Sequence, residues 1–209
     1  MALRDLWVEH IFWIRNYMLA GKADDRAQRD TAEAQVVANA KGVADTLEPF
    51  YGQAAAEQML ELLAGHWGAV RDVNSATVDP SASADPSASA DPSASADPSA
   101  DPSAAADPSA TTGGANPARD KAVKALNTNA REIAKFLSGA NPNLPEDAVF
   151  GLLAAHGAHH VAQIDLIAND DFGAEAQTWA AMRAHMFTIA DTIVDALAKQ
   201  FPEQFPAAA

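Results

Sequence analysis

Apolar side chains recur every three or four residues along most of the chain, and this periodicity constrains the fold more than any other feature. In residues 30–47, Val36, Ala40, Val43 and Leu47 fall on one face of a helix. No segment sustains the period of two that indicates half-buried strands. The pattern predicts an all-α protein, an up-down bundle of about six helices joined by short turns. The expected helices cover residues 3–17, 30–47, 53–73, 117–136, 149–167 and 174–199.

One segment breaks the helical pattern. Residues 79–96 contain the motif DPSASA three times, followed by DPSA, DPSAAA and DPSA. A proline every four to six residues blocks helix propagation, and few apolar side chains are present to offset the entropy of ordering. We expect a disordered acidic linker over 74–116 that divides one bundle into 1–73 and 117–201, with a tail at 202–209. A passive spacer is the simpler role for the linker, and a partner-binding segment is the alternative.

The two parts of the expected bundle resemble each other at a constant offset of 90 residues. Asn39 corresponds to Asn129, and His66 corresponds to His156. Matches between alanines or leucines are common in helices, whereas a paired Asn and a paired His at one offset are not. We interpret the pattern as a duplicated helical hairpin with the linker between the copies. The residues around the histidines of the first and last helices are also alike, and we interpret that likeness as coincidence or shared packing.

Four of the six histidines lie near the middle of four different predicted helices, on the apolar stripe of each. Mid-helix positions share one level in an up-down bundle, so the pattern predicts a layer of imidazoles inside the core. A fifth histidine lies one turn further along the same face of its helix. Neutral imidazole is a ligand of zinc, copper, iron and nickel. The candidate ligands of a transition metal are His10, His66, His156, His160 and His185.

Two other interpretations of these histidines are open. The rings can form His–Asn and His–backbone hydrogen bonds that set the register of the helices, with Asn39 and Asn129 nearby. Some rings can also lie at the surface of the bundle. The alternative function is then a structural or protein-interaction bundle without catalytic activity. An enzyme has the least support, because His156 or His185 could act as a general base but no nucleophile or oxyanion-stabilising group is visible. No catalytic residue is therefore predicted.

The patterns of several known metal sites do not occur in the sequence. Glu-x-x-His pairs of ferritin-like centres and the His-Glu-x-x-His of metalloproteases are absent. The predicted apolar stripes also carry no glutamate. Of a hemerythrin-like site, only His156-x-x-x-His160 is present.

The composition limits the expected partners and compartment. The net charge is −14, which argues against binding to a nucleic-acid backbone or to an anionic membrane surface. The absence of cysteine removes disulfides and Cys-ligated zinc, and is compatible with a reducing cytoplasm. No signal peptide is recognised, and no window approaches the roughly 18 apolar residues of a membrane span. We therefore expect a cytoplasmic protein, while its protein partners and oligomeric state stay open.

The motif LWxxHxxWxR at residues 6–15 resembles the start of a group of uncharacterised bacterial helical-bundle proteins. The resemblance covers nearly the whole chain except the linker, and it implies a folded helical bundle without adding an activity. This chain departs from the group in its long repeat insertion and in the additional His159 and His160. Further similarity lies in 49–52, 129–138, 141–143 and 185–202.

Overall fold

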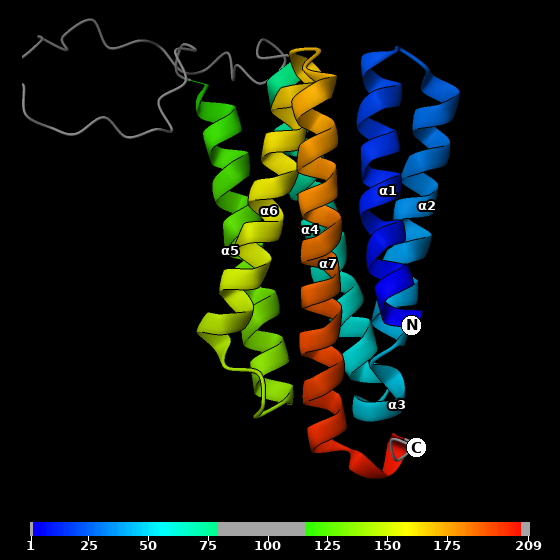
Figure 1. Cartoon of the computed structure of the whole chain (residues 1–209), viewed down its shortest axis with the longest axis vertical. Coiled ribbons are helices and arrows are strands. Elements are labelled where there is room, and N and C mark those ends of the chain that lie inside the picture. Colours follow the sequence, from blue (N-terminus) through cyan, green and yellow to red (C-terminus); the bar gives the residue numbers. More distant parts are fainter. Residues whose placement is uncertain (1, 79–115, 206–209) are drawn as a thin grey trace, which may run out of the picture.

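The computed structural model describes residues 2–78 and 116–205, and this part of the chain forms six long helices in up-down order (Figure 1). The prediction of an all-α up-down bundle is therefore confirmed. A single helical turn, α3 (Glu48–Tyr51), precedes the third long helix and ends at Gly52, whose φ of 81° favours glycine. The long helices are α1 (Ala2–Lys22), α2 (Arg26–Asp45), α4 (Gln53–Val78), α5 (Pro117–Ala140), α6 (Glu146–Ala168) and α7 (Phe172–Gln200).

The helix α4 continues five residues beyond its predicted end at Val73. Its buried face continues with Ala76, and the Thr77 hydroxyl donates to the Val73 carbonyl at 2.8 Å. The helix α5 begins where the sequence predicts, because Asn116 caps it and Pro117 occupies its first position. The first residues of the predicted linker, 74–78, are thus helical. The rest of that prediction, residues 79–115, lies outside the described residues.

The six long helices fall into two sets of three, and the two sets run in opposite directions. Figure 1 shows α1, α4 and α6 running in one direction and α2, α5 and α7 in the other. The helix α2 packs against α1 and α4, α5 packs against α4 and α6, and α7 packs against α6 and α1. Each helix of the second set thus bridges two helices of the first set. The bundle consists of three hairpins, α1–α2, α4–α5 and α6–α7.

The first and third hairpins have the same turn, at a constant offset of 146 residues. Asp24 and Asp170 both adopt the left-handed conformation, with φ of 55° and 60°. The next residue in each case, Asp25 and Asp171, caps the following helix by accepting a hydrogen bond from the backbone N–H three residues further on. In the second hairpin, α4 and α5 are separated in the sequence by residues 79–115, which lie outside the described residues.

The duplication inferred from the sequence is therefore part of a threefold arrangement. The offset of 90 residues relates α2 and α4 to α5 and α6, as predicted, and α7 and α1 supply the third copy. In this correspondence His185 occupies the position of Asn39 and Asn129 and is not the counterpart of His10. The sequence likeness around His10 and His185 is thus not a structural correspondence.

The buried apolar residues form two clusters along the bundle axis. The first contains Trp7, Leu63 and Leu153 and extends toward α3 and the end of α7. The second contains Ile14 and Trp67 and extends toward the α1–α2 turn. Burying each large side chain contributes about 1.5–3 kcal/mol, so these two clusters supply most of the driving force for folding. Mid-helix polar residues lie at the level where the clusters meet.

The C-terminal segment folds back onto the end of the bundle. A 3-10 turn (Pro202–Gln204) follows α7, and the Phe205 ring stacks on Phe50 with 5.8 Å between centroids. The predicted tail thus packs as far as Phe205, and residues 206–209 lie outside the described part. None of the described helices combines the length and the hydropathy that crossing a membrane requires.

Candidate metal centre

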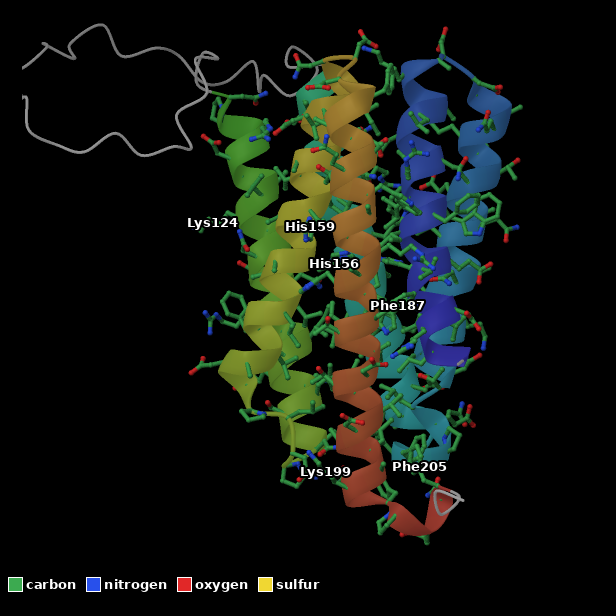
Figure 2. The ribbon with its side chains drawn as sticks, viewed as in Figure 1. Lys124, His156, His159, Phe187, Lys199 and Phe205 are labelled. Carbon is green, nitrogen blue, oxygen red and sulfur yellow. The ribbon has the colours of Figure 1, made fainter. Side chains whose placement is uncertain are left out.

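Four of the five predicted ligands come together in the middle of the bundle. Each of these histidines is at most 5% exposed. One ring nitrogen from each lies within 4.8 Å of the others. Figure 2 shows one of them, His156, near the middle of α6. The buried cluster consists of His10 on α1, His66 on α4, and His156 and His160 on α6.

Three of the four histidines occupy equivalent positions in the three hairpins. Each follows a leucine by four residues, and the carbonyl of that leucine accepts a hydrogen bond from a side chain of the next long helix. These bonds set the register of the second helix of each hairpin against the first. The three imidazoles lie at one level, with 5.3–5.7 Å between ring centroids. The bonds are Asn39 Nδ2 to Leu6 O at 3.0 Å, Asn129 Nδ2 to Leu62 O at 2.9 Å and His185 Nε2 to Leu152 O at 2.8 Å.

The fourth histidine, His160, has no counterpart among the other hairpins. The equivalent residues are Ile14 and Val70, and both are 0% exposed, as His160 is. In the other two hairpins, an aliphatic side chain therefore fills the equivalent buried position. An imidazole there costs desolvation free energy that an aliphatic side chain avoids. This comparison indicates that His160 is present for a reason other than packing.

The ring nitrogens are close enough to share one ion after small movements. Four nitrogens at about 2.0–2.1 Å from a tetrahedral ion lie about 3.3 Å from one another. The Nε2 atoms of His156 and His160 lie 3.1 Å apart, where they form a hydrogen bond with each other. The widest separation in the cluster, at most 4.8 Å, would have to shorten by about 1.5 Å. Rotations of the side chains about χ1 and χ2 can supply a shift of this size.

Each ring has a nitrogen without a hydrogen-bond partner among residues 2–78 and 116–205. These atoms are Nε2 of His10 and His66 and Nδ1 of His156 and His160. An unpaired buried polar atom costs about 1–3 kcal/mol. In the alternative, Asn side chains satisfy the rings, but Asn39 and Asn129 donate to leucine carbonyls and their own Oδ1 atoms are unpaired. Of the two, Asn129 lies close enough to His66 to raise the pKa of that ring. Ligation of an ion would use the unpaired Nε2 atoms of His10 and His66, and at His156 and His160 it would replace the hydrogen bond between their Nε2 atoms.

Burial keeps the four imidazoles neutral, which is the form that binds metals. Desolvation lowers the pKa of His10 to about 3, with a further contribution from the neighbouring His66. Desolvation also lowers the pKa of His66 to about 4, although the adjacent Asn129 side chain opposes this shift. For His156 and His160 the same cause, together with the surrounding imidazoles, places the pKa well below 6.5. Near pH 7 the cluster thus presents four uncharged donors.

The fifth predicted ligand, His185, is not part of the buried cluster, and its role as a metal ligand stays a prediction. The residue of α7 that points fully into the core is Met186, whereas His185 is partly exposed. A shift of one residue rotates a side chain by about 100° around a helix, which moves it from the core to its margin. The His185 ring lies beside His159 instead, with 5.6 Å between centroids.

A buried carboxylate near the cluster was not predicted from the sequence. Glu175, in the first turn of α7, is 0% exposed and forms a two-pronged ion pair with Arg15, at 2.6 Å and 2.7 Å. The Arg15 guanidinium lowers the pKa of Glu175. Gln163, one turn after His160, donates to the same carboxylate at 2.7 Å, and its own Oε1 is unpaired. The expectation that the apolar faces carry no glutamate is therefore wrong at Glu175.

An all-imidazole donor set favours transition metals. Magnesium and calcium prefer oxygen ligands, whereas neutral imidazole suits zinc, copper, iron and nickel. The buried cluster of four histidines could hold one such ion. Comparisons of the chain with protein-family models, curated proteins and solved structures find no match.

Proposed function

We propose that this protein binds a transition-metal ion, one of zinc, copper, iron or nickel, through His10, His66, His156 and His160. The observation that carries the proposal is the convergence of four buried imidazoles from three helices, with ring nitrogens within 4.8 Å. The unpaired ring nitrogens and the replacement of an aliphatic residue by His160 support it independently. Enclosure by the bundle suits tight retention of the ion more than turnover of a substrate on it.

The rival function is a structural or interaction bundle whose histidines bind no ion. It requires that burying four imidazoles serves the fold alone. The equivalent positions Ile14 and Val70 argue against this requirement, since aliphatic side chains fill the place of His160 in the other hairpins. The rival therefore predicts that replacing His160 by an aliphatic residue changes nothing except stability.

Metal content and thermal stability of the protein without an affinity tag test the proposal. After dialysis, elemental mass spectrometry is expected to find close to one equivalent of zinc, copper, iron or nickel in the wild-type chain. The variant His160→Ile, which copies Ile14, is expected to lose most of it. His159→Ala, which removes a partly exposed histidine and copies the equivalent Ala69, is the matched control and should retain the ion.

The thermal shift gives a second readout. Metal at a hundred times its dissociation constant stabilises the folded state by about 2.7 kcal/mol. For a protein of this size that corresponds to a rise of roughly 5–10 °C in melting temperature. Magnesium and calcium should produce no shift. Less than about a tenth of an equivalent of metal, together with no shift from any of the four metals, would refute the proposal.

A further inference from the structure

The buried position of the four imidazoles raises the question of how an ion reaches them. Each ligand is at most 5% exposed. A hydrated ion must exchange its water ligands for imidazoles before it enters such a site, so donors at the margin of the bundle would assist its passage. The two histidines that the buried cluster leaves out, His159 and His185, lie at this margin and are partly exposed.

These two rings lie beside each other at the margin of the bundle, partly exposed to solvent. Their centroids are 5.6 Å apart and their planes are inclined by 52°. His159 directly precedes His160 in α6, and His185 contacts the carbonyl of Leu152, one turn before His156. Figure 2 shows His159 close to His156 on α6. His159 is thus joined to the buried cluster through α6, and His185 through its contact with Leu152.

The hydrogen bond of His185 determines which nitrogen is free. Its Nε2 lies 2.8 Å from the Leu152 carbonyl oxygen, which can only accept. Nε2 therefore carries the hydrogen, and in the neutral ring Nδ1 has the free lone pair. A backbone carbonyl that orients a histidine through its other nitrogen is a common arrangement around metal ligands. His185 is thus held with a donor atom available.

Comparison of the hairpins separates the structural role of this position from a chemical one. The residues equivalent to His185 are Asn39 and Asn129, and both make the same bond to a leucine carbonyl. Asparagine therefore suffices for the structural bond, and only the imidazole adds a ligand atom. The residues equivalent to His159 are Trp13 and Ala69, so a histidine is not required there either. His159 and His185 both belong to the α6–α7 hairpin, and their rings lie side by side.

We infer that His159 and His185 form a second, peripheral metal site that binds a transition-metal ion transiently, with water as the remaining ligands, and passes it to the buried cluster. The inference rests on the proposed binding of metal by that cluster. A site with two imidazoles holds an ion weakly and releases it readily. The buried site, with four, retains it.

The rate of zinc uptake tests this inference. Metal-free, tag-free full-length protein is mixed rapidly with one equivalent of zinc and a chromophoric chelator that reports free zinc. His185→Asn preserves the bond to Leu152, as Asn39 and Asn129 do, and His159→Ala copies Ala69. Both variants should reach the wild-type zinc content but load about tenfold more slowly, a factor equivalent to 1.4 kcal/mol. Lys124→Ala, at an exposed position of α5, should load at the wild-type rate.

A zinc titration measures metal binding by His159 and His185 separately from binding by the buried cluster. Zinc added beyond one equivalent should bind weakly and shift the ring-proton NMR signals of His159 and His185, and His185→Asn should abolish this step. Unchanged loading rates in both histidine variants, or no weak step in the wild-type chain, would overturn the inference. If the wild-type chain instead lacks the tight equivalent but shows the weak step, the proposed function fails while the peripheral site stands.

Discussion

Acidification of the metal-free protein should reduce its stability strongly, because four buried histidines must stay neutral in the folded state. Their ordinary pKa is 6.5, and burial lowers it to about 3 for His10, to about 4 for His66, and well below 6.5 for His156 and His160. Below pH 6.5 the unfolded chain therefore binds protons that the folded chain does not. The stabilisation is present above pH 6.5 and is lost as the pH falls.

The magnitude follows from this difference in proton binding. Between pH 7 and pH 5.5, each histidine that protonates only in the unfolded state lowers the free energy of unfolding by slightly more than about 1 kcal/mol. Four such residues remove about 5 kcal/mol, which is comparable with the whole stability of many domains. The low pKa of Glu175 also favours folding, but that contribution is lost mainly below pH 4.5, outside this window.

Urea denaturation at the two pH values, with a chelator present throughout, measures the effect. His160→Ile is the matched control, since removal of one buried imidazole should reduce the loss to about 4 kcal/mol. A loss below about 1 kcal/mol in the wild-type chain would show that the rings are hydrated or protonated in the folded state. The burial of the four imidazoles in the folded chain would then be wrong.

Three substitutions test other parts of the structure by urea denaturation. At pH 7 without metal, His160→Ile should change the free energy of unfolding by less than about 1 kcal/mol, because it removes one unpaired buried nitrogen but also the hydrogen bond between His160 and His156; a loss of more than about 3 kcal/mol would contradict the equivalence with Ile14. Asn129→Leu should cost about 1–2 kcal/mol through loss of the bond to Leu62, and a neutral effect would discount the register role of that bond. Glu175→Gln should cost about 2 kcal/mol, since it leaves the partly buried Arg15 without its ion pair, and wild-type stability would contradict the pairing.

The helices could be predicted from the sequence because burial of one face requires apolar residues at three- and four-residue spacing. Helix ends were less predictable: α4 runs on to Val78 because Ala76 extends its buried face. The third copy of the hairpin could not be predicted from the sequence for a different reason. Its key polar residue is His185 where the other copies have asparagine, and residues 79–115 lengthen the spacing from 33 residues to 67 in the middle copy.

Four of the five candidate ligands could be found from the sequence, since mid-helix histidines on apolar faces converge when the helices pack. His185 could not be placed, because a rotation of one residue on α7 decides between core and margin, and Met186 takes the core position. Glu175 could not be found either, since its burial depends on Arg15, 160 residues away in the chain. Contacts of this kind are set by tertiary packing, which local periodicity does not encode.

X-ray absorption spectroscopy of the metal-loaded protein tests the central claim most directly, because it counts the atoms that surround the ion. For zinc, we expect a first shell of nitrogen atoms at about 2.0–2.1 Å, with scattering from the outer atoms of four imidazole rings. His160→Ile, which is expected to lose most of the ion, should show little of this imidazole shell after dialysis. A shell made mainly of oxygen atoms, or one without imidazole scattering, would show that the ion binds elsewhere and that the buried histidines are not its ligands.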